Sequence, residues 1–447
     1  MEIFLALLGF FSLGLIVWLL LKDYTTPALA FISVSISVAC ILLILEQLGF
    51  GVGVALGVKG GVFDIKTLVA FIKDGVKSVT DTAALFVFSI LFFSVLNASG
   101  FFTKILNAFL SKMKANVYQV CILTVFIAAA VHLDGSGAST FLIVIPALLP
   151  IYERLSIRKT SMLLIITSAM GVMNVIPWGG PTLRAATNIG MDANLLWHHI
   201  IPIQIVGLVL SLLLAIWIAK IEIKRGAGAG NLSGINLNIE KSEHHNEKWF
   251  WLNLLVAIGV IGLLISGIIP SYICFMIGLA IILPLNYPNL KTAKKVLDRA
   301  SGAMLMYITL IGAGILIGVF DKSGIMEKMG VLILNFVPDY LGAYIPLMVG
   351  ILAVPMAIIF CTDSYFYGVM PIVLSVTKAF GAEPLTIAII MVIARNCATF
   401  ISPVVPATLL GCGLAEVNIK DHIKRSFFYI WGISIICLIF AEVAGII

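Results

Sequence analysis

The most constraining feature of the sequence is a succession of apolar runs, each long enough to cross a lipid bilayer. A membrane-spanning helix needs about 20 apolar residues, and 61% of the 447 residues are hydrophobic while only 11% are charged. Soluble domains are usually about 25% charged. The chain is therefore predicted to be an all-α protein of the cell membrane with about 10 transmembrane helices. The first run, residues 3–21, lacks a basic leader and a small-residue cleavage site, and we interpret it as a retained span.

Charge and cysteine usage exclude several classes of function. The net charge of +6 is spread over short loops, which suits topology selection and does not indicate nucleic-acid binding. The seven cysteines show no CxxC spacing and most lie in apolar runs, as expected of small core residues. No metal-ligand cluster or nucleophile–base spacing is apparent, so an enzyme is not predicted.

An internal repeat divides the chain. Several anchors recur about 225 residues later. They are Ser99-Gly100 with Ser323-Gly324, Pro146 with Pro371, Pro177 with Pro403, and Met191-Asp192 with Ala415-Glu416. The predicted units are scaffold spans (1–81), a first repeat (82–222), a polar cytoplasmic linker (223–248), further scaffold spans (249–300) and a second repeat (301–447).

Each repeat contains a candidate hairpin followed by a candidate broken span. The hairpins cover residues 116–152 and 341–380, and the broken spans cover 159–190 and 385–415. The two apolar pieces of each hairpin are joined by a short turn with small residues. Such a turn at membrane depth must be buried in protein or face a water-filled cavity. The pattern favours re-entrant hairpins, although one tilted span interrupted by glycines remains an alternative.

The distribution of basic residues predicts how the repeats are oriented. The positive-inside rule assigns most of them to the cytoplasm. They are Lys104, Lys112, Lys114, Arg154, Arg158, Lys159, Lys220, Lys224, Arg225, Lys291, Lys294, Lys295, Arg299, Lys420, Lys424 and Arg425. The first hairpin then opens inward and the second outward, so the repeats are inverted as in many secondary transporters. The exceptions are Lys59, Lys66, Lys73 and Lys77, whose positive charge is partly offset by nearby aspartates.

Five ionisable residues lie in the hairpins and broken spans, where they are functional candidates by default. They are His132, Asp134, Arg184, Asp363 and Arg395. An arginine can grip a carboxylate with two parallel hydrogen bonds, or it can pair internally with a buried aspartate. The aspartates can exchange a proton or a cation, or they can cap the turns. His132 can relay protons or simply be hydrogen-bonded.

The breaks themselves suit an anion. Prolines interrupt each broken span, at WGGPT in the first and at SPVVPAT in the second. A helix that restarts after such a break points free N–H groups and a positive dipole end into the protein. Gly179 and Gly180 allow a ligand to approach the backbone closely. A kink used only for packing is the alternative.

Two strings carry a family resemblance. HLDGSGASTFLIVIPALLPIYERL and GVMNVIPWGGPTLRAA closely resemble the citrate–divalent-metal/proton symporter family of the ion transporter superfamily, and DSYFYGVMPIV and CATFISPVVPAT resemble its second half. The resemblance covers essentially the whole chain. It implies a carrier of citrate bound to a divalent metal (magnesium or calcium type), coupled to protons. It also implies an elevator-like transport domain, a homodimer and no resident cofactor.

The residue types and the resemblance together define a candidate site. The predicted substrate-binding residues are Gly135, Ser136, Gly137, Ser139, Thr140, Gly179, Gly180, Pro181, Thr182, Arg184, Ser364, Tyr365, Arg395, Asn396, Thr399, Ser402, Pro406, Ala407 and Thr408. Asp134, Asp363 and His132 are predicted to couple protons or cations, and both aspartates to contact the metal of a metal–citrate complex. Sodium-coupled relatives carry Ser-Asn-Thr at the hairpin turns, here called the tips, and this chain does not. The difference favours a proton or a chelated metal as the coupling ion. A carrier of another carboxylate or small anion, and a channel, are the alternatives.

Overall fold

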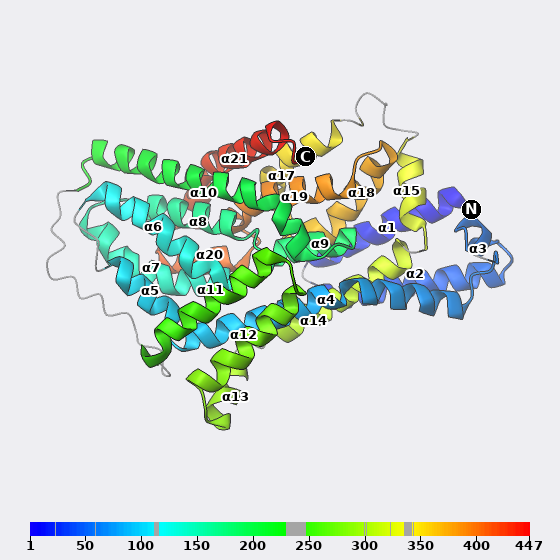
Figure 1. The fold of residues 1–447 in the computed structure, drawn as a ribbon. Coiled ribbons are helices and arrows are strands. Elements are labelled where there is room, and N and C mark those ends of the chain that lie inside the picture. Colours follow the sequence, from blue (N-terminus) through cyan, green and yellow to red (C-terminus); the bar gives the residue numbers. More distant parts are fainter. Residues whose placement is uncertain are drawn as a thin grey trace.

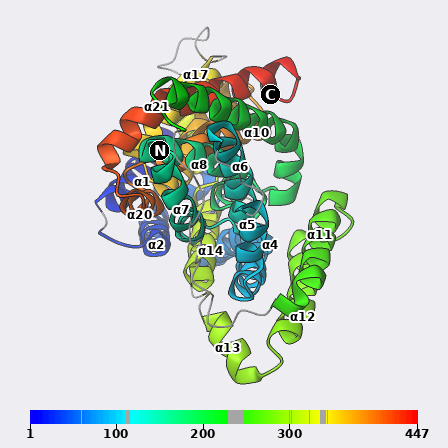
Figure 2. The same cartoon turned by 90° about the vertical axis from the view of Figure 1, so that its left-hand side faces the viewer.

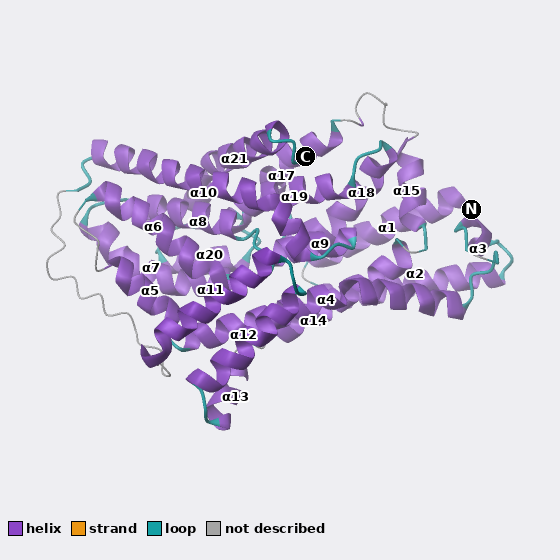
Figure 3. Ribbon diagram, in the orientation of Figure 1, coloured by secondary structure: helices purple, strands orange, loops and turns teal. Residues whose placement is uncertain are grey.

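The computed structural model describes residues 1–447 except 23, 59, 111–115, 229–246, 299, 301, 322, 335–341 and 343. All regular elements in this described part are helices (Figure 3). Eight of them are long and apolar enough to cross a membrane. The prediction of an all-α, multi-pass membrane protein is confirmed at this level.

The first half contains α1 (Glu2–Leu21), α2 (Pro27–Gln47), α3 (Val52–Ala55), α4 (Ile65–Ala98), α5 (Phe101–Leu110), α6 (Val117–Val131), η1 (His132–Asp134), α7 (Gly137–Arg154), α8 (Lys159–Met173), α9 (Gly180–Ile189) and α10 (Ala193–Lys224). The second half contains η2 (Glu247–Trp249), α11 (Phe250–Ser266), α12 (Ser271–Asn286), α13 (Leu290–Asp298), α14 (Gly302–Phe320), α15 (Ile325–Leu334), α17 (Ile345–Ile359), η3 (Ser364–Val369), α18 (Met370–Ala379), α19 (Pro384–Cys397), η4 (Thr399–Ile401), α20 (Pro406–Leu414) and α21 (Ile419–Val443).

Several of the predicted segment boundaries fall inside a helix or outside the described residues. Residue 82, the predicted start of the first repeat, lies inside α4, which runs unbroken from Ile65 to Ala98 and contains no proline to end it. Most of the predicted linker 223–248 lies outside the described residues, and so do Lys59, Lys112, Lys114 and Arg299. The hairpin start at residue 341 also lies outside them.

Two long helices, α4 and α14, pack along each other and form the spine of the molecule (Figure 1). Helix α12 packs on α4, and α2 packs on α14. Seen from the end of the molecule, α11, α12 and α13 lie at one edge (Figure 2). Several contacts of the first half have a counterpart in the second. Helix α6 packs on α8, and α17 packs on α19 in the same way. Helix α7 packs on α20, and η3 correspondingly packs on α9.

The spine depends on glycines that let two backbones touch. A Cβ added at Gly75 of α4 would collide with backbone atoms of Gly314 and Gly318 in α14. A Cβ at Gly318 would in turn collide with the backbone of Phe71. Small residues allow this kind of close helix approach in membrane proteins. The distance between α4 and α14 therefore leaves no room for even one methyl group at these positions.

We predict that Gly75→Ala destabilises the protein, because backbone atoms cannot move aside as a flexible side chain can. The expected loss is about 1–3 kcal/mol, as for an overpacked core. Thermal unfolding in detergent measures it. The matched control is Gly262→Ala in α11, where an added Cβ meets nothing within 4 Å. Equal unfolding midpoints for the two variants would contradict the close α4–α14 contact.

Candidate functional site

The first tip is the tight turn between α6 and α7, residues 132–136, and it is held by its own side chains. Gly135 has a φ of +71°, which lets the chain reverse after η1. Asp134 Oδ1 accepts a hydrogen bond from the backbone N–H of Ser136 at 2.8 Å. The Ser136 side chain caps α7 by accepting from the N–H of Ser139 at 3.2 Å. The buried His132 places Nδ1 2.9 Å from the hydroxyl of Thr140.

The first break separates α8 from α9 at residues 174–179. Pro181 lies in the first turn of α9, where its missing N–H costs nothing. The Thr182 hydroxyl donates to the carbonyl of Val175 at 2.9 Å and so satisfies backbone exposed by the break. The Trp178 indole N–H donates to the carbonyl of Leu133 at 2.8 Å. The first break is thereby bonded directly to the first tip.

The second tip and second break repeat this arrangement with different residues. Helix α17 ends at Ile359, and the turn leads into the π-helix η3, which begins at Ser364. Its Ser364 hydroxyl lies 3.1 Å from the sulfur of Cys361. The hydroxyl of Ser402, in the second break, donates to the carbonyl of Ala357 in α17. Helix α20 then restarts with Pro406 in its first turn.

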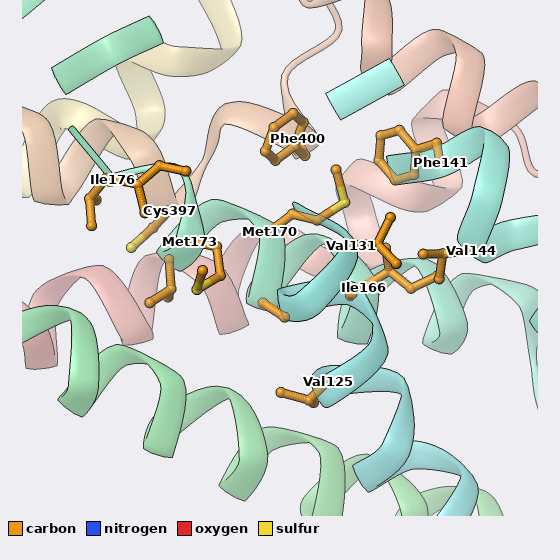
Figure 4. Packing of buried hydrophobic residues seen from close by; sticks show 14 of the residues in the cluster. Val125, Val131, Phe141, Val144, Ile166, Met170, Met173, Ile176, Cys397 and Phe400 are labelled. Atoms are coloured by element: carbon orange, nitrogen blue, oxygen red, sulfur yellow. The ribbon is translucent and has the colours of Figure 1, made fainter. Parts of the chain in front are cut away.

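Each tip also packs against the break of the other half. Gly137 lies so close to Phe400 and Ala407 of the second break that an added Cβ would collide with the Phe400 ring. In Figure 4, Phe400 and Cys397 lie in the same apolar cluster as Met170 of α8 and Val131 of α6. The hydrophobic core therefore joins the two halves around the breaks.

The two broken helices meet directly at this crossing. A Cβ at Gly171 of α8 would contact the carbonyls of Asn396 and Cys397 in α19. The Asn174 amide donates to the amide oxygen of Asn396 at 3.5 Å. Thr408 donates to the carbonyl of Thr399 at 3.5 Å, across the second break. The polar residues of both breaks thus surround one central region.

An ion pair links the first break to the second tip. Arg184 Nε of α9 donates to Asp363 Oδ1 at 2.7 Å, and the two side chains are 7% and 23% exposed. The same guanidinium contacts the sulfur of Met306 at 3.6 Å and lies over the ring of Tyr367. It also occupies the space beside Gly180, where a Cβ would come within 2.6 Å of Nη1.

Arg395 of α19 is fully buried and has a different environment. It donates to the hydroxyl of Thr399 at 3.2 Å, the carbonyl of Phe360 at 3.3 Å and the hydroxyl of Thr362 at 3.5 Å. Within the described part of the chain, no carboxylate forms an ion pair with it, and its Nε has no hydrogen-bond partner. Tyr365 presents its ring 5.8 Å from the guanidinium carbon.

A cavity of about 560 Å³ lies beside the first tip. Its polar lining consists of Asp134, Ser136, Ser139, Ser94 and Asn97, and Trp178 and Met306 are among its apolar walls. The Asn97 amide donates to the Ser139 hydroxyl at 3.2 Å. Met306 connects the cavity to Arg184, which it contacts. The cavity therefore presents oxygen atoms on one side and approaches a guanidinium on another.

The predicted residues of each tip and break lie together in the structure, and several of their partners were not predicted from the sequence. Asn97, Trp178 and Asn188 were not predicted, although each is a polar or aromatic residue near the end of an apolar run. The Asn188 amide donates to the carbonyl of Phe366 at 2.7 Å and so holds the second tip. Within the described residues, no group of three or more His, Cys, Asp or Glu side chains is arranged to hold a metal ion.

Two broken helices that cross inside a bundle of candidate membrane spans, with a polar cavity beside one of the turns, are the architecture of a multi-pass membrane transporter. The model of the citrate transporter family matches residues 13–394. The chain therefore belongs to this family of transporters, as the resemblance in the sequence indicated, and is a multi-pass protein of the cell membrane.

Two relatives from Bacillus subtilis and one solved structure illustrate the similarity. The chain is 28% identical over 444 residues to a citrate transporter, with 99% of each chain covered. It is 31% identical over 355 residues to a Mg(2+)/citrate complex secondary transporter, covering 78% of this chain and 82% of the relative. The fold resembles the YdaH transporter of Alcanivorax borkumensis, with a TM-score of 0.63, 16% identity, and coverage of 94% and 99% of the two chains.

We predict that Arg184 and Asp363 are energetically coupled. Arg184→Gln and Asp363→Asn should each lower the free energy of unfolding, because each single change leaves one charge buried without its partner. The double variant should lose less than the sum of the two single losses. The coupling energy should be about 1–3 kcal/mol. Unfolding of the three variants and the unchanged protein in detergent measures it. Strictly additive effects would show that the ion pair does not form.

Proposed function

We propose that the chain takes up citrate as a complex with a divalent metal ion, in symport with protons. The observation that carries this proposal is the buried Arg395, a cation without a carboxylate partner in the described structure, beside the break and tip of the second half. A buried charge left unpaired is strongly unfavourable. A carboxylate of the substrate would supply the missing partner. Membership of the citrate transporter family supports this choice of anion.

The net charge of the site fits a metal complex better than free citrate. Arg184 and Arg395 contribute two positive charges, and Asp134 and Asp363 contribute up to two negative charges. Fully ionised citrate carries three negative charges, whereas its complex with one divalent ion carries one. The complex can therefore enter with little uncompensated charge. One relative is named as a Mg(2+)/citrate complex secondary transporter, which agrees with this cargo.

The cavity at the first tip suits the metal end of the complex. Asp134, Ser136, Ser139 and Asn97 line it, and each has a side-chain oxygen atom. Magnesium and calcium prefer oxygen ligands, and magnesium usually keeps several of its waters. Of the two predicted metal contacts, Asp134 is favoured, since Arg184 lies 2.7 Å from Asp363 and repels a second cation. The substrate-binding role of the other predicted tip and break residues is part of the same proposal.

The ion pair provides a route for proton coupling. A substrate carboxylate that binds Arg184 competes with Asp363 for the same guanidinium. A proton on Asp363 removes this competition and releases Arg184 for the substrate. Proton and citrate then bind together, as symport requires. His132 is buried against Thr140 and is assigned the lesser role of holding the first tip.

Movement of the hairpins and broken spans against the scaffold would give alternating access. We place re-entrant hairpins at residues 116–152 and 341–380, in two inverted repeats. We also infer a homodimer in which the scaffold spans of the two subunits pair. The equivalent packing of α6 on α8 and of α17 on α19 supports the repeat. The aromatic contact of Phe31 with Tyr367, ring centroids 4.6 Å apart, is one place where scaffold and hairpin would separate.

A carrier of another di- or tricarboxylate, or of a small organic anion, with proton or sodium coupling, is the second candidate. Two arginines at the paired breaks suit any such anion. Competition of labelled citrate uptake by a panel of carboxylates separates the candidates, since the true substrate should compete best.

We predict that uptake of labelled citrate into proteoliposomes requires both a divalent cation and an inward proton gradient. Chelation of the cation leaves citrate too negative for the site, and collapse of the gradient removes the driving force. Protein-free vesicles give the background rate, and both treatments should reduce uptake towards it. Citrate flux that ignores both the cation and the gradient would refute the coupling.

We also predict that a disulfide between α1 and the second hairpin stops transport. A Cβ at Gly368 would contact the side chain of Val17, so Val17→Cys with Gly368→Cys lies within reach of a disulfide. The seven native cysteines are first replaced. Oxidation should abolish uptake in proteoliposomes, and a reductant should restore it. Full flux in protein verified as cross-linked would contradict movement of the hairpin against α1.

A further inference from the structure

Away from the proposed site, a buried carboxylate gathers three arginines where α8, α10 and α21 meet. Glu222 of α10 has a fully buried side chain. It accepts hydrogen bonds from the Ser161 hydroxyl at 2.6 Å, from Arg158 Nε at 2.7 Å and from Arg225 Nε at 3.1 Å. Arg425 of α21 donates to the Ser161 hydroxyl at 3.2 Å and lies 3.8 Å from Glu222.

The three guanidinium groups exceed the charge of this one carboxylate by two. Arg425 Nε is buried without a hydrogen-bond partner in the described structure. The side chains of Arg158 and Arg225 are 35% and 48% exposed, so both reach the surface. The arginines therefore have N–H groups to spare for a further anion.

Two acids lie beside Lys159, the residue that follows Arg158, and bind that lysine. Glu153 and Glu416 both bind Lys159, at 2.8 Å and 2.6 Å, and are 51% and 73% exposed to solvent. Exposed ion pairs of this kind are screened by water and contribute little. Among the described residues, Glu222 is the one carboxylate that forms ion pairs with these three guanidinium groups.

The side chains around the cluster change from apolar to basic within about one turn on both helices. On α10, Trp217 is 56% exposed, and the exposed Lys220 and Lys224 follow it. On α21, the exposed Lys424 precedes Phe428, which is 75% exposed. Exposed aromatic side chains next to lysines are typical of the level of lipid headgroups. Because Arg225 and Arg425 both approach Glu222, the two boundaries lie at the same depth.

We propose that Arg158, Arg225 and Arg425 bind the phosphodiester headgroup of an anionic phospholipid, with its acyl chains beside Trp217 and Phe428. A planar guanidinium donates paired hydrogen bonds to phosphate oxygens. Basic pockets between membrane helices on the cytoplasmic side are suited to anionic headgroups. Phe428 lies about one turn from Arg425, and Trp217 lies about two turns from Arg225. These apolar side chains favour a lipid over a free phosphate ion, which has no acyl chain to place against them.

The site is separate from the proposed citrate site, which uses Arg184 and Arg395. Glu222 then has a defined role, because it holds the three arginines together where α8, α10 and α21 meet. Arg225 also donates to the carbonyl of Ser156 at 3.1 Å, and Arg425 lies over the ring of Tyr429. The lipid would complete the charge balance of this junction. Its binding can be measured without any transport.

The test titrates delipidated, full-length protein in detergent with phosphatidylglycerol and, separately, with phosphatidylcholine of the same acyl chains. Native mass spectrometry counts the bound lipids. The unchanged protein should prefer phosphatidylglycerol, and Arg225→Gln with Arg425→Gln should weaken its binding about thirtyfold, as for the loss of two basic contacts to an anionic headgroup. The control is Lys291→Gln with Lys294→Gln in α13, which removes the same charge elsewhere and should keep the preference.

Arg225→Gln alone is the milder variant, because its side chain is half-exposed, and it should weaken binding about fivefold. Equal affinity for the two lipids, or a preference that survives in the arginine variants, would overturn the proposal. Inorganic phosphate is titrated in a third arm, with thermal unfolding as the readout. If phosphate stabilises the unchanged protein as strongly as phosphatidylglycerol does, the ligand is a soluble ion and the lipid assignment is wrong.

Discussion

The interior backbone of a membrane protein must find all its hydrogen-bond partners within the protein, and the central region of this molecule is organised by that requirement. Two helices stop and restart there, which frees carbonyl and N–H groups. Side chains next to the breaks bond to several of these groups: Thr182 to Val175, Trp178 to Leu133, Ser402 to Ala357 and Arg395 to Phe360. Polar residues in these apolar segments thus have a structural task as well as a proposed functional one.

A second consequence is that the tips and breaks are shared between the halves. The first tip packs on Phe400 of the second break, and Asp363 of the second tip binds Arg184 of the first helix to restart. The two broken helices contact each other at Gly171 and Asn396. A change at one tip therefore alters the surroundings of the opposite break. Such sharing is compatible with the proposed alternating-access movement around one site.

The two arginines illustrate how location separates residues that are alike in sequence. Arg184 is partly neutralised by Asp363, whereas Arg395 is buried among hydroxyls, a carbonyl and an aromatic ring. An anion arriving at Arg395 gains a partner without displacing one. An anion arriving at Arg184 must compete with a carboxylate. In the proposed function, Arg395 therefore binds the substrate and Arg184 takes part in proton coupling.

The sequence by itself determined the class of the protein and the positions of its chemistry. Apolar length predicted the helical membrane fold, and prolines and glycines placed both breaks, because these residues act locally on the backbone. Only the tertiary structure decided the pairings. Arg184 meets Asp363, and Asn97 reaches Ser139, only because the fold brings together helices that are far apart in the chain. The close contact of α4 with α14 was likewise decided by the tertiary structure, since Gly75 and Gly314 lie far apart in the chain.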